Sequence, residues 1–217
     1  MTYETLERAA IARHLRVLGG FHPETDDGVP VDCKTVILLG PDEPAFWPHL
    51  KTQPEYRDGA ADPVDRWSFR VVDAWANELG AKALFPFGGP THLPFFKWAT
   101  RTGRFHASPI LLLVHDRAGL FASIRGALVL RDRFKLPAAP ANPCIGCENR
   151  PCLNACPVGA LSIEKYDVPL CKAHIASEDT ANCLGRGCAA RRACPVSQNF
   201  GRLPEQSAYH MQRFLAP

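Results

Sequence analysis

The position of the cysteines constrains this chain of 217 residues more than any other feature of its sequence. Residues 1–140 contain only Cys33, whereas residues 141–200 contain the other eight. A chain of this length can bury a hydrophobic core that needs no cross-links. The eight cysteines therefore require a chemical explanation rather than a role in stabilising a small fold.

The first four of these cysteines follow a spacing that is typical of iron–sulfur proteins. They read Cys144-x2-Cys147-x4-Cys152-x3-Cys156-Pro157, which is the bacterial ferredoxin pattern C-x2-C-x2-C-x3-C-P with two residues inserted before the third ligand. In that pattern three sulfurs point at one [4Fe–4S] cube, and the cysteine before the proline ligates a neighbouring cube. One such run therefore predicts a second.

The rest of the cysteine-rich segment supplies the second run. It contains Cys171 and then Cys183-x4-Cys188-x5-Cys194-Pro195, so the Cys-Pro ending recurs. Because the last cysteine of each run is expected to ligate the other cluster, we predict two crossed ligand sets. The first cysteine set is Cys144, Cys147, Cys152 and Cys194, and the second cysteine set is Cys171, Cys183, Cys188 and Cys156.

Other uses of cysteine are alternatives to this interpretation. Structural zinc sites also use C-x2-C pairs, but they rarely carry a Cys-Pro ending twice. Disulfides are disfavoured in a reducing cytosol, where unpaired thiols persist and take up metal. A single cluster or a three-iron form is a further alternative. Cys33 precedes an apolar segment and is expected to be a small buried residue rather than a ligand.

Charge and hydropathy argue against nucleic acid and membranes as partners. The formal net charge is +3, and no run of Lys or Arg alternates with aromatic residues. Two loaded clusters would add about −4, which leaves a chain of about −1. The longest apolar run, Ile110–Val114, is far too short to span a membrane. The N-terminal segment has no apolar signal region and no twin arginine, so we expect a cytoplasmic protein.

The patterning predicts an α+β protein with three parts. We expect an α+β domain at residues 1–140 that can bind a cofactor or a partner, a ferredoxin-type domain with two [4Fe–4S] clusters at 141–202, and a C-terminal helix at 203–217. The Pro-rich stretch Leu136–Pro143 predicts an extended linker. Because the cysteine-rich part has little periodicity, we expect metal rather than a large core to order it.

Hydrophobic periodicity and turn residues predict the individual elements. One helix is expected to be capped by Thr2 or Thr5 and to stop at Gly19-Gly20, and a second is expected to begin at Asp62-Pro63. Strands are expected at Lys34–Leu39, Ala83–Phe87, Pro109–His115 and Phe121–Leu130, and a final helix at Pro204–Leu215. The last two strands are expected to pair with each other across the turn at residues 116–119.

With the cysteine pattern, two upstream segments carry a resemblance to a known group of enzymes. Trp98-Ala-Thr-Arg101-Thr-Gly103 and Ser108-Pro-Ile-Leu-Leu-Leu-Val-His115 precede the cysteines. Over about residues 85–200 the chain resembles epoxyqueuosine reductases and reductive dehalogenases. The resemblance implies a nitroreductase-like N-terminal domain, a ferredoxin-like domain with two [4Fe–4S] clusters, and a cobalamin that receives their electrons.

A further segment resembles the cobalamin-processing chaperones of CblC type. Their pattern I-H-P-x-F-G-x-W-F-x-x-R-G is similar to Val114–Gly126, and this implies that Arg125 faces a corrinoid. One departure concerns the proton donor of epoxyqueuosine reductases, an Asp, because Gly89 occupies that position here. We therefore do not expect epoxyqueuosine reductase activity itself.

By these resemblances, five residues are candidates for cofactor binding: Arg125, His115, Trp98, Arg101 and Ser108. The residue types also allow structural roles. His115 can cap the turn after its strand instead of ligating cobalt. Arg125 lies in an apolar segment and needs either an anionic cofactor group or a buried carboxylate as its partner. Trp98 can belong to the core rather than form a stacking platform.

Two functions fit the sequence. In the first, the protein is an iron–sulfur oxidoreductase whose clusters pass single electrons to a cobalamin, a flavin or a substrate bound by residues 1–140. In the second, it is a ferredoxin-like electron carrier or docking subunit with no substrate pocket of its own. Both functions require a redox partner protein.

Overall fold

The computed structural model describes residues 1–89, 92–177 and 179–216, which fold into two compact units. The first unit consists of the described residues of Met1–Arg104 and Ser123–Pro140, and the second of those of Phe105–Ala122 and Ala141–Pro217. Residues 105–122, which the sequence predicts in the N-terminal domain, fold with the cysteine-rich segment. The expected boundary near residue 140 is therefore one of three places where the chain passes between units.

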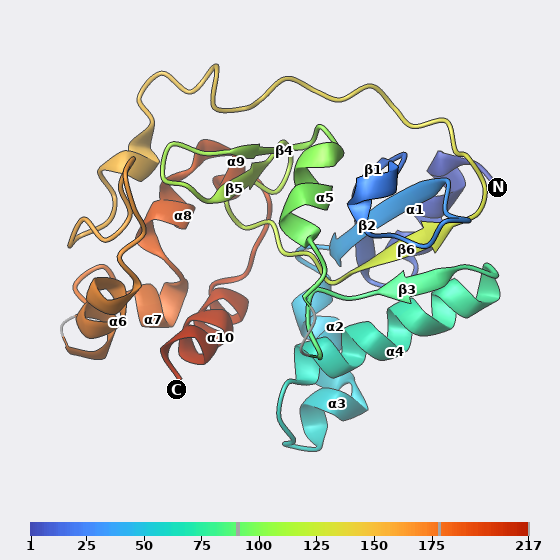
Figure 1. Ribbon diagram of the computed structural model, residues 1–217. Coiled ribbons are helices and arrows are strands. Elements are labelled where there is room, and N and C mark those ends of the chain that lie inside the picture. Colours follow the sequence, from blue (N-terminus) through green and yellow to red (C-terminus); the bar gives the residue numbers. More distant parts are fainter. Residues whose placement is uncertain (90–91, 178, 217) are drawn as a thin grey trace. The chain divides into compact units, whose positions relative to one another are not determined.

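The first unit is an antiparallel sheet with helices, so the α+β class is confirmed (Figure 1). Its helices are α1 (Tyr3–Ile11), α2 (Phe46–Thr52), α3 (Pro54–Arg57), α4 (Pro63–Glu78) and α5 (Phe95–Arg101), with a 3-10 turn η1 (Thr25–Asp27). Its strands are β1 (Leu15–Phe21), β2 (Thr35–Pro41), β3 (Lys82–Leu84) and β6 (Gly126–Leu130), in the order β1-β2-β6-β3.

Burial on both faces explains which strands are central. Every residue of β2 and β6 is buried, as expected for strands that are covered on both sides. Leu128 of β6 lies opposite Ile37 of β2 on one side and Ala83 of β3 on the other. Helix α4 packs against β3 and β6, and α1 packs against β1. The predicted start of α4 is confirmed, because Pro63 occupies its first turn.

Two expectations about this sheet are wrong. Phe121–Leu130 does not pair with Pro109–His115, because β6 begins only at Gly126 and its partners are β2 and β3. β6 instead occupies an inner position of the sheet, between β2 and β3. The first helix does not reach Gly19-Gly20. It begins after the predicted cap Thr2, whose side chain accepts from the Thr5 N–H at 3.2 Å, and it ends at Ile11.

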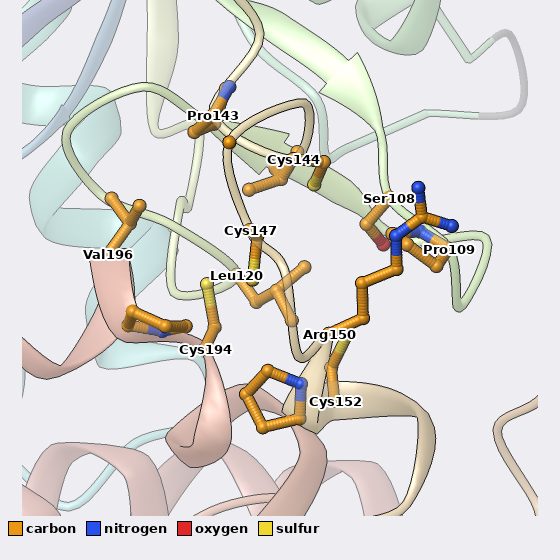
Figure 2. Close-up of a pocket in the computed structure, with 14 residues that line it drawn as sticks. Ser108, Pro109, Leu120, Pro143, Cys144, Cys147, Arg150, Cys152, Cys194 and Val196 are labelled. Carbon is orange, nitrogen blue, oxygen red and sulfur yellow. The ribbon is translucent and has the colours of Figure 1, made fainter.

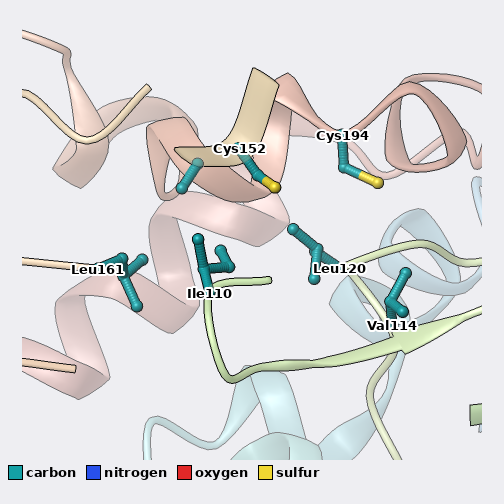
Figure 3. Packing of buried hydrophobic residues seen from close by; sticks show 7 residues of the cluster. Ile110, Val114, Leu120, Cys152, Leu161 and Cys194 are labelled. Atoms are coloured by element: carbon teal, nitrogen blue, oxygen red, sulfur yellow. The ribbon is translucent and has the colours of Figure 1, made fainter. Parts of the chain in front are cut away.

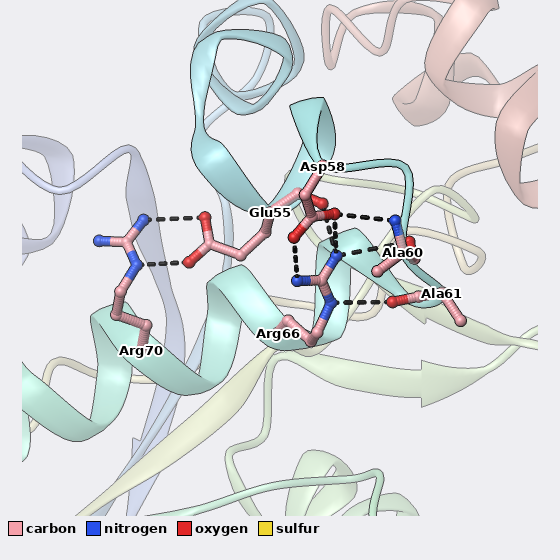
Figure 4. Close-up of polar contacts among 6 residues, drawn as sticks. All are labelled: Glu55, Asp58, Ala60, Ala61, Arg66 and Arg70. Atoms are coloured by element: carbon pink, nitrogen blue, oxygen red, sulfur yellow. Dashed lines mark hydrogen bonds and ion pairs between the residues drawn. The ribbon is translucent and has the colours of Figure 1, made fainter.

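Paired charges join α3 to the first turns of α4 (Figure 4). Arg70 donates to both carboxylate oxygens of Glu55, at 2.5 and 3.1 Å, and Arg66 donates to both oxygens of Asp58, at 2.7 and 2.8 Å. Such bidentate contacts are the stronger kind of charge-assisted hydrogen bond. The hydrogen bond from Arg70 lowers the pKa of Glu55, and that from Arg66 lowers the pKa of Asp58 to about 2.

These contacts predict that acid weakens the first unit. A carboxyl with a depressed folded-state pKa stabilises the fold above its unfolded pKa of about 4, and this contribution is lost as the pH falls through the folded pKa. We expect the urea midpoint to fall more steeply below about pH 4.5 in the wild type than in the Glu55→Gln/Asp58→Asn variant. Tryptophan fluorescence measures the urea midpoint of the first unit, because all four tryptophans lie in that unit. Equal slopes would contradict the expectation.

The second unit has short elements and a small core of its own. It contains β4 (Phe105–Ala107), β5 (Leu113–His115), η2 (Pro151–Leu153), α6 (Val168–Ser177), α7 (Cys183–Arg186), α8 (Ala189–Ala193), α9 (Pro195–Gln198) and α10 (Pro204–Leu215). The predicted final helix, α10, is confirmed and packs against α6 and α7. β4 and β5 form an antiparallel hairpin. No described helix is long and apolar enough to cross a membrane.

The core of the second unit combines the hairpin with cysteines. Its buried residues are Ile110, Val114, Leu120, Cys152, Leu161, Ala190 and Cys194 (Figure 3). Ile110 and Leu120 come from the segment that also contains β4 and β5, and they pack against Cys152 and Cys194. This apolar core is small, so the expectation that metal rather than a large core orders this part stays a prediction.

Candidate metal centre

The four cysteines of the first set surround one cavity of about 160 Å³ (Figure 2). Cys144, Cys147, Cys152 and Cys194 all line it, although Cys194 lies 42 positions after Cys152 in the chain. The remaining lining residues are mostly apolar or proline. The two that carry other polar side chains are Ser108 and Arg150.

Local backbone structure holds each of these cysteines. The Cys144 N–H donates to Asn142 Oδ1 at 2.9 Å, and the Cys147 N–H donates to the Cys144 carbonyl at 3.4 Å, so both lie in one tight turn. Cys152 lies in the 3-10 turn η2. Cys194 is the extended residue before α9, whose first position is Pro195.

The thiols of the first set lie close enough to interact electrostatically. Burial raises the pKa of Cys144, and negative charge on Cys194, Cys152 and Cys147 would raise it further, while Arg150 lowers it. Burial also raises the pKa of Cys152, with Cys194 and Cys147 as the next contributions. The thiols of Cys144 and Cys152 therefore resist ionisation unless a positive charge lies beside them.

The second set is also brought together. Burial raises the pKa of Cys171, and the neighbouring charges that add to this are those of Cys188 and Cys156. Burial likewise raises the pKa of Cys183, and negative charge on Cys188 adds to this. Cys188 thus interacts with both Cys171 and Cys183. The two groups of thiols have the same members as the two predicted sets, and their ligation of clusters stays a prediction.

Hydrogen bonds and close packing support the second set. The Tyr166 hydroxyl donates to Cys171 Sγ at 3.8 Å, and the Asp179 carboxylate accepts from the Cys183 N–H at 2.6 Å. Gly187, just before Cys188, has φ +88°, and a Cβ there would lie 2.6 Å from Ser207 Cβ of α10. Only glycine allows this turn and this approach, which explains its presence between the ligand candidates.

The donor set and the cavity fit an iron–sulfur cube. Among the described residues, no three His, Cys, Asp or Glu side chains converge closely enough to hold a single metal ion. A tetrahedral zinc would hold its sulfurs about 3.8 Å apart. The first set instead lines an open volume larger than one water or one ion would fill. Soft thiolates around such a volume are the ligands of iron–sulfur clusters.

The two sets border the same hydrophobic core. Cys152 and Cys194 of the first set are members of it, and Cys156 and Cys188 of the second set pack against it, as does Tyr166. Residues 105–122, which contain the β4–β5 hairpin, supply Ile110, Val114 and Leu120 to this core. Sequence reasoning missed this role of residues 105–122. The available signal was the apolar run Ile110–Val114, which is too short and too isolated to name its partner.

His115 occupies a structural position. Its Nδ1 accepts hydrogen bonds from the Arg117 and Ala118 N–H groups, both at 3.1 Å, so the neutral ring carries its proton on Nε2. That nitrogen lies 3.2 Å from Asp116 Oδ1. His115 therefore caps its turn, which is the structural alternative to cofactor binding.

Arg125 is paired with a carboxylate. Its Nη1 lies 2.8 Å from Asp65 Oδ1, and its Nε donates to the Ile124 carbonyl at 3.0 Å. Burial raises the pKa of Asp65 even though Arg125 opposes this, so desolvation of this partly buried pair offsets much of its attraction. The alternative of a carboxylate partner is the one observed.

The other candidates of the first unit are also held by protein groups. Trp98 is fully buried, and its indole N–H donates to the Asp27 carbonyl at 2.8 Å. Arg101 contacts Glu24 at 2.9 Å and donates to the His22 carbonyl at 3.0 Å. Cys33 is half-buried, and its thiol donates to the Thr35 carbonyl at 3.4 Å. Cys33 is not among the residues that group with either cysteine set.

Comparisons with known proteins give one similarity. No family model matches the chain, and no curated protein matches it. The chain is similar to a crystal structure of selenomethionine-labelled epoxyqueuosine reductase, with a TM-score of 0.44 and 14% sequence identity over 95% of this chain. It spans 64% of the length of that protein. Fold similarity of this degree does not assign an activity.

Proposed function

We propose that this chain is an electron-transfer protein that holds two [4Fe–4S] clusters, one on each cysteine set. The observation that carries this proposal is the cavity lined by Cys144, Cys147, Cys152 and Cys194. Its four sulfurs come from two distant parts of the chain, as crossed ligation requires. When bound, such clusters supply one-electron redox chemistry.

The protein groups favour cluster binding in two ways. Burial raises the pKa of the Cys144 and Cys152 thiols, so a positively charged iron core would offset a thiolate charge that these positions otherwise disfavour. Ile110 and Leu120 are buried in the same core as Cys152 and Cys194, so apolar side chains shield these two sulfurs from solvent. Both sets border this one core, which keeps the proposed electron path inside the second unit.

The proposed partners are redox proteins. Each electron would enter from a reduced one-electron carrier of the ferredoxin or flavodoxin class and leave to an oxidised acceptor protein. We do not propose a bound corrinoid or flavin as the electron acceptor, because four of the five residues suggested for cofactor binding are held by contacts within the protein. The fifth, Ser108, lines the cavity of the first cysteine set.

A reductive titration tests this function. Anaerobically reconstituted protein, titrated with dithionite, is expected to take up about two electrons per chain, one for each cluster. The visible absorption should bleach in step, and EPR should show paramagnetic reduced clusters. Uptake of no electrons by iron-loaded protein would contradict electron transfer. Titration with hydroxocobalamin or FMN tests the cofactor hypothesis in parallel. A shift in the absorption spectrum of either compound that indicates tight binding would favour that hypothesis again.

A further inference from the structure

Ser108 presents a buried hydroxyl that has no partner among the described residues. The residue is only 5% exposed, and its Oγ makes no hydrogen bond to any described group. Leaving a buried hydroxyl unsatisfied costs about 1–3 kcal/mol, so native proteins rarely do so without a reason. The same residue lines the cavity of the first cysteine set (Figure 2).

The backbone fixes Ser108 in this place. Its N–H donates to the Leu112 carbonyl at 2.9 Å, and its carbonyl accepts from the Leu111 N–H at 3.0 Å. Leu111 adopts a left-handed conformation with φ +62°, which is strained for a branched side chain. These contacts close the tip of the β4–β5 hairpin. Backbone hydrogen bonds therefore hold Ser108 at the cavity wall.

Among the side chains that line the cavity with Ser108, those able to accept a hydrogen bond are the four cysteines. Apart from the four cysteines, Arg150 is the other lining residue with a polar side chain, and it is exposed to solvent. Water therefore screens the charge of Arg150, whereas the Ser108 hydroxyl is shielded. Hydrogen bonds to the sulfurs of an iron–sulfur cluster stabilise its more negative, reduced state and raise its potential.

We propose that the Ser108 hydroxyl donates a hydrogen bond to a sulfur of the cluster on the first cysteine set and raises the reduction potential of that cluster. This inference rests on the proposed function. It separates the two clusters chemically, because the second set has a different donor, the Tyr166 hydroxyl beside Cys171 Sγ. Each cluster then has its own hydroxyl donor, and substituting one donor should change the potential of one cluster alone.

The test measures both midpoint potentials by EPR-monitored redox titration of anaerobically reconstituted protein. Ser108→Ala is expected to keep its full iron content and to lower one potential. The equilibrium constant for reduction of that cluster should fall about threefold to tenfold. A tenfold fall corresponds to a midpoint potential that is lower by about 59 mV for a one-electron reduction. Tyr166→Phe, which keeps the ring stacked near Phe214, should lower only the other potential. Ser108→Thr retains a hydroxyl and should restore the wild-type value.

Two results overturn the inference about Ser108. Full iron with both potentials unchanged in Ser108→Ala means that the hydroxyl does not bond to the cluster. Equal shifts of both potentials mean that the substitution acts on the fold rather than on one cluster. Failure of the proposed function looks different, because the wild-type protein itself would then hold no iron or take up no electrons.

Discussion

A variant that lacks both Cys152 and Cys194 is expected to keep about half of the iron of the wild type, whereas one that lacks both Cys152 and Cys156 is expected to keep almost none. The first pair lies in one cavity, so its loss removes two ligands from a single cluster. The second pair is divided between the sets, because Cys156 interacts with Cys171. Removing it takes one ligand from each cluster. Iron analysis of anaerobically reconstituted protein measures the difference.

The same two variants exclude uncrossed ligation. If each cluster used four consecutive cysteines, Cys152 and Cys156 would share one cluster, and Cys194 would belong to the other. The two iron contents would then be exchanged. Both variants remove two thiols and introduce two alanines, so each serves as the matched control for the other. The surviving cluster of the Cys152→Ala/Cys194→Ala variant also identifies which potential belongs to the second cysteine set.

Gly119→Ala is expected to destabilise the second unit by about 2–4 kcal/mol. Gly119 has φ +56°, and a Cβ there would lie 2.4 Å from the Ser197 backbone nitrogen and 2.5 Å from its Oγ. The neighbouring Leu120 N–H donates to that same Oγ at 2.8 Å. The substitution therefore forces apart the turn after β5 and the start of α9, which follows Cys194. Urea unfolding followed by circular dichroism, with iron release as a second signal, measures the loss.

Gly159→Ala is the matched control for this prediction. Gly159 lies in the same unit and has a similar φ of +63°, but a Cβ there would meet no atom within 4 Å. Its substitution should carry only the conformational cost of about 1–2 kcal/mol. If the two variants were equally stable, the contact between Gly119 and Ser197 would not contribute to the fold as described.

The sequence groups the cysteines by ligand spacing, which is a local property with a strict chemical requirement. The Cys-Pro endings at Cys156 and Cys194 predict crossed ligation, and that ligation stays a prediction. The structure brings the same members together in each set. The predicted helices α4 and α10 follow from similarly local signals, namely apolar spacing and a proline at the start.

The long-range partners could not be predicted in the same way. Strands that are consecutive in sequence pair in about two thirds of cases, and this favoured a hairpin for Phe121–Leu130. The residues Gly126–Leu130 are apolar on both faces, which indicates a central strand but does not name its neighbours. Likewise, nothing local shows that Ile110 packs beside Cys152, 42 positions later.

Single residues were the least predictable, because their roles depend on partners from elsewhere in the fold. The sequence allows either a cofactor or a carboxylate as the partner of Arg125, and only the position of Asp65 in the fold decides between them. The role of His115 is set by two backbone N–H groups of its own turn, which donate hydrogen bonds to its ring. Ser108 gave no signal in sequence beyond the resemblance of its segment, and its interest comes from the absence of a hydrogen-bond partner among the described residues.

The most direct test of the whole account is a count of iron and acid-labile sulfide in protein prepared without oxygen. Two cubes on eight thiolates predict about eight iron and eight sulfide per chain, in a brown protein that dithionite bleaches. A colourless preparation that contains zinc and no sulfide, or one in which iron stops at about four per chain, would contradict it.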